Sequence, residues 1–195
     1  MSINETKIDL LKDLGIDENS IFPVLEKMVE GETKFLRDLR INLKNILNSE
    51  HYNIKEAYLI ATSIAVNDKN NHLISAFTKL AKLNGATETE IAEVYACAST
   101  LATNNVFYRF KHFIKSSTEI YQSMPAGIKM NIMMNPVLGK ELFELISLAV
   151  SAVNGCESCV NSHEESVRKL GSSEARIFNT IKLASIVKGL SIALN

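Results

Sequence analysis

The sequence of 195 residues has no excess of positive charge and no long hydrophobic run. Its formal net charge is −1, whereas proteins that bind nucleic acids need a basic surface that displaces counterions. No apolar run approaches the roughly 20 residues that span a bilayer. The N-terminal stretch MSINETKIDLLKDLG lacks the apolar core of a signal peptide. We therefore expect a cytoplasmic protein that binds neither nucleic acid nor a membrane.

Proline is also scarce, and the chain has only Pro23, Pro125 and Pro136. Hydrophobic residues make up 46% of the sequence, and they recur at helical spacing along most of it, as in a helix predicted over about 33–48. The long weakly patterned stretch, 116–138, holds two of the prolines. These patterns predict an all-α fold in which 116–138 crosses between two halves.

Those two halves resemble one another at an offset of 86 residues. Gly85 in the first coincides with Gly171 in the second, and in each half a helix-ending glycine is followed by a helix cap at the same place. We infer an internal duplication of a helical unit, with repeat halves at about 54–115 and 139–193.

Cysteine is the third scarce residue, with three in the chain, yet Cys156 and Cys159 lie three residues apart. A reducing cytoplasm disfavours structural disulfides, so a close pair indicates redox chemistry or metal binding. Asn154 and Gly155 are predicted to end one helix, and the next begins at or beside Cys156. On that helix Cys159 and His163 share a face.

The positive end of a helix lowers the pKa of a thiol and favours the reactive thiolate. Two cysteines three residues apart at such a position can close into a disulfide, and His163 can take or give the proton. The aligned positions of the first half hold Asn70, Leu73 and Phe77, so only the second half carries this chemistry. A site of this kind can be oxidised, reduced by another dithiol and used again.

Other interpretations remain open. The two cysteines could be incidental core residues, or Cys156, Cys159 and His163 could bind zinc with Glu144 as the further ligand in view. A c-type haem is excluded because Val160, and not histidine, follows the second cysteine. A carboxylate such as Glu144 near His163 could also orient the imidazole and tune its proton affinity. We favour the catalytic dithiol.

Several stretches carry a resemblance to a known family: Glu144, Cys156-x-x-Cys159 and His163, together with NNVFYRF at 104–110, MNIMMNP at 130–136 and FELISLAVSAVNGC at 143–156. The sequence resembles the AhpD family of alkyl hydroperoxide reductases, within the carboxymuconolactone decarboxylase-like superfamily. The resemblance covers about residues 30–193. Residues 1–30 are then expected to form an N-terminal helical extension to an all-helical domain at 31–195.

The resemblance implies an all-α fold with an internal repeat, commonly a homotrimer, and an antioxidant thiol peroxidase activity. The dithiol of the family reduces the oxidised form of AhpC, a peroxiredoxin, and turns over alkyl hydroperoxides slowly. Its electrons come from dihydrolipoyl groups on the lipoylated acyltransferase of a 2-oxoacid dehydrogenase complex, with no cofactor bound to the protein itself.

The family's residue roles can be carried over position by position. Cys159 is implied to be the peroxide-facing thiol that becomes a sulfenic acid. Cys156 is implied to be the proton donor and resolving thiol, which gives a Cys156–Cys159 disulfide. His163 and Glu144 are implied to form the proton relay that activates Cys159.

The sequence departs from the family at one position. Well-known members have a histidine immediately before the second cysteine, whereas this chain has Ser158, preceded by Glu157. A hydroxyl is a poor base at neutral pH, and a nearby negative charge opposes thiolate formation unless it points to solvent. We therefore hypothesise a weaker direct peroxidase than the family standard, or different partners.

Two further predictions concern sulfur elsewhere in the chain. Cys97, in a stretch of small residues, is expected to be a packed core residue. Met130, Met133 and Met134 are expected in the core or at a subunit interface. The alternative function is a non-redox carboxymuconolactone decarboxylase-like enzyme, or a helical binding protein whose cysteines are incidental.

Overall fold

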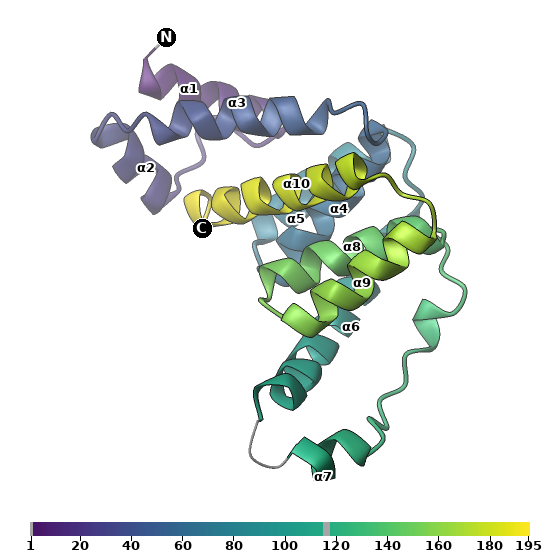
Figure 1. Ribbon diagram of the computed structural model, residues 1–195. Helices are drawn as coiled ribbons and strands as arrows, with labels where there is room; N and C mark the ends of the chain where they lie inside the picture. Colours follow the sequence, from purple (N-terminus) through teal and green to yellow (C-terminus); the bar gives the residue numbers. More distant parts are fainter. Residues whose placement is uncertain (1, 115–117) are drawn as a thin grey trace.

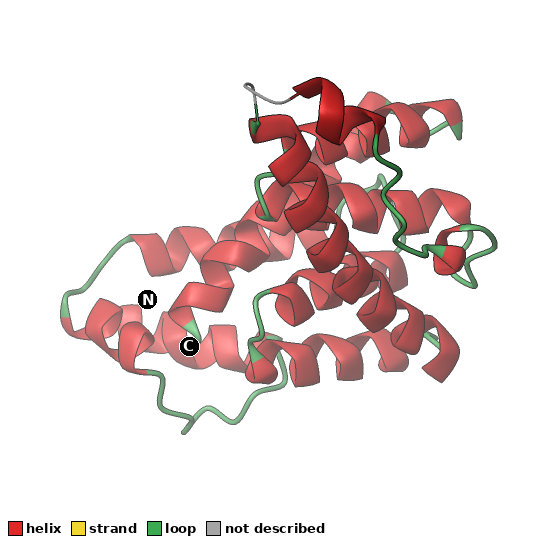
Figure 2. Ribbon diagram, turned by 90° about the horizontal axis from the view of Figure 1, so that it is seen from below, coloured by secondary structure: helices red, strands yellow, loops and turns green. Residues whose placement is uncertain are grey.

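The computed structural model describes residues 2–114 and 118–195, which form helices joined by loops (Figures 1 and 2). The α-helices of these residues are α1 (Ile3–Asp13), α2 (Pro23–Glu30), α3 (Phe35–Leu47), α4 (Ile54–Asn67), α5 (Asn71–Leu83), α6 (Glu88–Phe113), α7 (Thr118–Ser123), α8 (Lys140–Val153), α9 (Glu157–Lys169) and α10 (Glu174–Ala193). No strand occurs in the described ranges, so the all-α prediction is confirmed. None of these helices combines the length and apolar character needed to cross a bilayer.

The helix bounds follow the offset found in the sequence. Helices α4, α5 and α6 begin 86 residues before α8, α9 and α10, and α4 and α5 also end 86 residues before α8 and α9. Gly85 (φ 89°) and Gly171 (φ 98°) both adopt the left-handed conformation that a side chain disfavours, and each ends a helix. The bounds therefore agree with an internal duplication. The end of the first predicted half, residue 115, lies outside the described residues.

Helices α4 and α8 form the centre of the molecule. Residues 59–65 of α4 and 145–151 of α8 are buried without interruption, again at the offset of 86. A helix that is buried on all sides must be covered on several faces. Helix α4 packs against α5, α6, α8 and α10, and α8 packs against α6, α9 and α10. In Figure 1, α10 lies in front of α4, against which it packs, and α9 lies beside α8.

The N-terminal helices pack into the same core. Helix α1 packs against α3 and α2, and Leu10, Leu11 and Leu25 are fully buried in the main hydrophobic cluster. A capping box at Ser2 and Glu5 fixes the start of α1. The division into an extension at residues 1–30 and a domain at 31–195 stays a prediction.

The crossing between the halves returns from the far end of α6 to the start of α8 (Figure 1). Residues 116 and 117 of this predicted segment lie outside the described residues. The remainder contains α7 and a short 3₁₀ helix, Asn131–Met133. Both carboxylate oxygens of Glu93 on α6 accept hydrogen bonds from the backbone, from the nitrogens of Val137 (2.8 Å) and Leu138 (2.7 Å). Glu93 therefore fastens the end of the crossing to α6.

Candidate active site

A tight turn between α8 and α9 positions the two neighbouring cysteines. Helix α8 ends at Val153, and Gly155 adopts φ 66°, which reverses the chain over two residues. Cys156 is the N-cap of α9, and its backbone nitrogen donates to the carbonyl oxygen of Ser151 at 3.1 Å. The sequence therefore places Cys156 at the helix start, as its pattern predicted.

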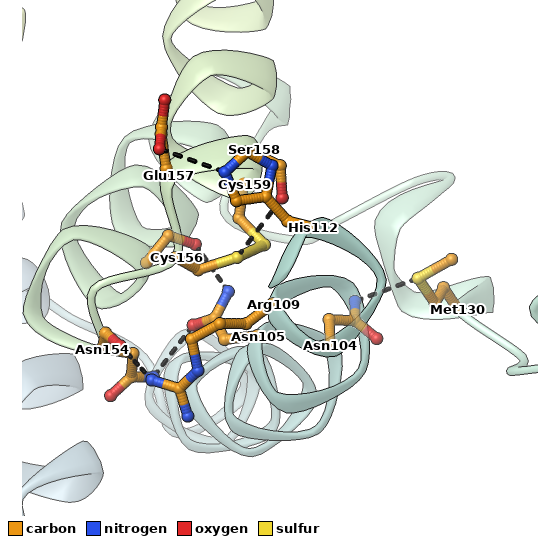
Figure 3. The surroundings of a disulfide bond; sticks show 11 residues. Asn104, Asn105, Arg109, His112, Met130, Asn154, Cys156, Glu157, Ser158 and Cys159 are labelled. Atoms are coloured by element: carbon orange, nitrogen blue, oxygen red, sulfur yellow. Dashed lines mark hydrogen bonds and ion pairs between the residues drawn. A yellow bond between two sulfur atoms is a disulfide. The ribbon is translucent and has the colours of Figure 1, made fainter. Parts of the chain in front are cut away.

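A network of polar side chains holds this turn from behind (Figure 3). The Asn154 side chain exchanges hydrogen bonds with Asn67 at 3.0 Å and donates to Asn105 Oδ1 at 2.9 Å. Asn105 in turn donates to Ser151 Oγ, and Arg109 donates to the Asn154 carbonyl oxygen at 2.6 Å. Helix α6 thus fixes the turn that carries Cys156. We did not predict this support, although two of its members lie in the stretch NNVFYRF.

Cys156 and Cys159 are joined by a disulfide, with their Cα atoms 5.3 Å apart (Figure 3). The two cysteines differ in exposure: Cys156 is fully buried, whereas Cys159 retains 7% of its surface. A reactant that approaches from solvent therefore meets the sulfur of Cys159 first.

His163 and Glu144 meet although they are 19 residues apart in the sequence. Their contact joins His163 Nδ1 on α9 to Glu144 Oε2 on α8 at 2.7 Å, and both side chains are largely buried. Because Nδ1 is engaged by the carboxylate, Nε2 is the nitrogen left to exchange a proton. Cys159 lies one turn before His163 on the same face of α9. The four residues singled out in the sequence thus gather at one place.

A cavity of about 230 Å³ opens onto Cys159 and His163. Asn104 and Tyr108 of α6 form one wall, and Met130 from the crossing forms part of another. Pockets for drug-sized ligands measure about 300–1,000 Å³, so this cavity suits a smaller molecule.

Met130 and Met133 both line the cavity. Met133 also packs against the main hydrophobic cluster, in agreement with the expected core position, and the subunit interface stays a prediction. Each of the two is partly exposed, because the crossing packs over the mouth of the site. The stretch MNIMMNP contributed to the family resemblance, but it did not predict that Met130 and Met133 would line this cavity.

Ser158 and Glu157 stand at the positions that depart from the family pattern, and their side chains point in different directions. Ser158 lines the cavity, and its Oγ lies 3.7 Å from Cys156 Sγ. Glu157 points to solvent, with 72% of its side chain exposed, and pairs with His112 Nε2 at 3.1 Å (Figure 3). Its charge is therefore screened by water and by the imidazole.

The third cysteine lies apart from this chemistry. Cys97 on α6 is fully buried, as predicted, and its Sγ lies 3.6 Å from Ser147 Oγ. Burial raises the pKa of the Cys97 thiol to about 12, with the nearby Glu144 charge adding to the rise. Such a thiol is inert at neutral pH.

The zinc interpretation gains no support from the arrangement of side chains. In the part of the chain that the structure describes, no group of three or more His, Cys, Asp or Glu side chains is placed to hold a metal ion.

Comparison with known proteins gives consistent matches. A sequence model of the carboxymuconolactone decarboxylase family matches residues 121–195. A protein of Coxiella burnetii (strain RSA 493 / Nine Mile phase I), named alkyl hydroperoxide reductase AhpD, is 36% identical over 160 residues, which cover 80% of this chain and 89% of the relative. A protein of the same name in Rhodopseudomonas palustris (strain BisB18) is 35% identical, over 87% of this chain and 92% of the relative. Another, in Anaeromyxobacter dehalogenans (strain 2CP-C), is 36% identical, over 87% of this chain and 90% of the relative.

Proposed function

Because the chain belongs to the AhpD family of alkyl hydroperoxide reductases, we propose that it reduces organic hydroperoxides with its Cys156–Cys159 dithiol. One observation carries this proposal: the disulfide opens, through Cys159 alone, into a small cavity beside the His163–Glu144 pair. An accessible sulfur, a proton carrier and space for a small ligand are the parts that thiol peroxidase chemistry requires.

In the oxidative half-reaction His163 takes the proton of the Cys159 thiol, and Glu144 stabilises the imidazolium that results. The thiolate attacks the outer oxygen of the hydroperoxide, the O–O bond breaks, and the alcohol leaves with a proton from the relay. Cys159 is then a sulfenic acid. The Cys156 thiol attacks this sulfur, water leaves, and the disulfide forms.

In the reductive half-reaction a thiolate of a dihydrolipoyl group attacks Cys159 Sγ, because Cys156 is buried. The Cys156–Cys159 bond breaks, and Cys156 leaves as the thiolate. The second thiol of the reductant then attacks its own sulfur in the mixed disulfide, which releases Cys159 and closes the lipoyl ring. Both half-reactions use the same sulfur and the same cavity.

We assign the same dithiol a second role, the reduction of an AhpC-type peroxiredoxin. The reduced Cys159 attacks the disulfide of the oxidised peroxiredoxin, and Cys156 resolves the mixed disulfide. The electrons come from the lipoylated acyltransferase of a 2-oxoacid dehydrogenase complex, with no cofactor bound to this chain. The cytoplasm, where thiols are kept reduced, is the compartment in which such a cycle runs.

The assembly we propose is a homo-oligomer, a homotrimer as the family resemblance implies. Its support is that large apolar side chains are exposed on two helices that pack together, namely Ile41 on α3 (56% exposed) and Phe178 (63%) and Ile192 (56%) on α10.

Thiol titration tests the function directly. The reduced protein is expected to lose two thiols together on addition of tert-butyl hydroperoxide and to regain both with dihydrolipoamide. Cys159→Ser should abolish the cycle while retaining the circular dichroism spectrum of the native fold. Cys97→Ala is the matched control, because it removes a thiol from outside the cavity and should leave the cycle intact. Two thiols that ignore both reagents would support the non-redox alternative.

A further inference from the structure

Asn104 is a buried polar side chain in the cavity wall whose hydrogen bonding is incomplete. Only 4% of its surface is exposed. Its Nδ2 donates to the thioether sulfur of Met130 at 3.0 Å (Figure 3), and its Oδ1 has no partner. Nearly all buried polar atoms in proteins are paired, so the Asn104 amide has hydrogen-bonding capacity that the protein itself does not use.

The adjacent residue, Asn105, shows that a side-chain amide on α6 can have partners for both of its polar atoms. Asn105 donates to Ser151 Oγ and accepts from Asn154 Nδ2, so both of its polar atoms are engaged in the network behind the turn. Asn104 faces the cavity and has no such network.

The internal repeat shows that the fold itself does not need an amide at this position. At the offset of 86 residues, Asn104 corresponds to Leu190 on α10, which is fully buried. The second half of the repeat therefore fills the same helix position with an apolar side chain. A buried asparagine costs more than a leucine unless something binds it.

The cavity lining restricts what that ligand can be. Apart from His163, the residues around the cavity carry no charge, and Tyr108, Met130 and Met133 make much of the wall apolar. A carboxylate or a phosphate would find no cation there, whereas a small neutral alkyl or aryl group would bury apolar surface against these side chains. The polar part of the ligand must then meet Asn104 and Cys159.

A hydroperoxide matches the unused capacity of the Asn104 amide. Its oxygens can accept from Nδ2, and rotation of the amide would let its O–H donate to Oδ1, which is enclosed in this conformation. The thioether of Met130 is a weak acceptor, so replacing that bond with one to a peroxide oxygen is favourable.

We propose that Asn104 binds and orients the hydroperoxy group of a small neutral alkyl hydroperoxide, holding its outer oxygen at Cys159. This inference rests on the proposed function and adds a substrate-binding residue to it. The reductant does not depend on the Asn104 amide, because a dithiol presents only the weakly hydrogen-bonding S–H group.

The test compares the two half-reactions in Asn104→Leu, which introduces the residue that the repeat carries at 190. We expect oxidation of the reduced protein by tert-butyl or cumene hydroperoxide to slow about 10-fold, the effect of losing one neutral hydrogen bond to the substrate. Reduction of the disulfide by dithiothreitol should stay within about twofold of the wild type. Asn179→Leu makes the same exchange at a partly exposed position of α10, outside the cavity, and should alter neither rate.

Each other outcome counts against the proposal. Oxidation at the wild-type rate, or equal losses in both half-reactions, would assign Asn104 a purely structural role. Asn104→Ala provides a second variant if the leucine does not fold, and it must show the same split between oxidation and reduction. A wild-type protein that is reduced by dithiothreitol but ignores both hydroperoxides would overturn the proposed function, and this inference with it.

Discussion

His163 Nδ1 lies 2.7 Å from Glu144 Oε2, across the interface between α9 and α8. At the offset of 86 residues the same two positions hold Phe77 and Tyr58, whose rings pack with their centroids 6.4 Å apart. One pair of helices thus carries an aromatic contact in the first half and a carboxylate–imidazole pair in the second. Because the first half packs this helix pair with an aromatic contact, packing alone does not require the carboxylate–imidazole pair of the second half. We therefore attribute that pair to the chemistry of the site.

The first prediction concerns the carboxylate. Glu144→Gln keeps the shape and a hydrogen-bond acceptor but removes the charge that stabilises the His163 imidazolium. Oxidation of the reduced dithiol by cumene hydroperoxide should slow by about 10- to 100-fold, measured by stopped-flow or quenched thiol counts. Glu164→Gln, which removes a carboxylate from the exposed face of α9, is the control and should react at the wild-type rate. Equal rates in the two variants would remove Glu144 from the relay.

The second prediction concerns the position before the second cysteine. Ser158 lines the cavity, and its hydroxyl lies 3.7 Å from Cys156 Sγ, where it can carry a hydrogen bond but cannot act as a base at neutral pH. Ser158→His should raise the rate of peroxide turnover by about 10-fold, because it adds a second proton carrier beside the dithiol. Ser158→Asn, which adds bulk without a titratable group, is the control. Turnover by the histidine variant no faster than wild type would show that the serine does not weaken the site.

The third prediction concerns the crossing between the halves, which carries Met130 and Met133. Glu93→Gln leaves one of the two backbone nitrogens, Val137 or Leu138, without its acceptor and removes the charge from both bonds. The free energy of unfolding should fall by about 2 kcal/mol, a decrease in Tm of roughly 4–8 °C for a chain of this size. Glu88→Gln, at an exposed site on the same helix, should change Tm by less than about 2 °C. A Glu93 variant with unchanged Tm would mean that other contacts hold the crossing.

The fourth prediction concerns the buried third thiol. Because burial raises the pKa of Cys97 to about 12, the native oxidised protein should show no thiol that reacts with iodoacetamide at pH 8–9. One thiol per chain should appear in denaturant. The unfolded thiol ionises near pH 8.5, so the contribution of Cys97 to stability is complete below that pH and is lost as the pH rises towards 12. Rapid labelling of Cys97 in the native protein would contradict the burial described here.

Much of the fold and part of the site could be predicted from the sequence. Helix ends depend on local signals, such as Gly85 and Gly171, so their positions could be read directly. Cys156, Cys159 and His163 lie on a single helix, and helical geometry alone places Cys159 and His163 on one face. Glu144 could be named from the sequence as a candidate carboxylate partner of His163, but its place in the relay came from the family resemblance, because periodicity does not reveal which face of α8 meets α9.

The rest of the site depends on how distant segments pack. Asn104 and Arg109 belong to one helix but serve the cavity and the turn respectively, and only the packing of α6 against α8 and α9 separates these roles. Met130 and Met133 reach the cavity because Glu93 fastens the crossing nearby. Contacts of this kind join residues that are 26 to 45 positions apart, and no local pattern in the sequence records them.

The most direct measurement is the intact mass and thiol content of the reduced protein after titration with cumene hydroperoxide. We predict that one equivalent of hydroperoxide removes the mass of two hydrogens and two thiols per chain, that one equivalent of cumyl alcohol is formed, and that peptide mapping finds Cys156 joined to Cys159 with Cys97 still reduced. An unchanged mass, with all three thiols intact and the hydroperoxide unconsumed, would contradict the account.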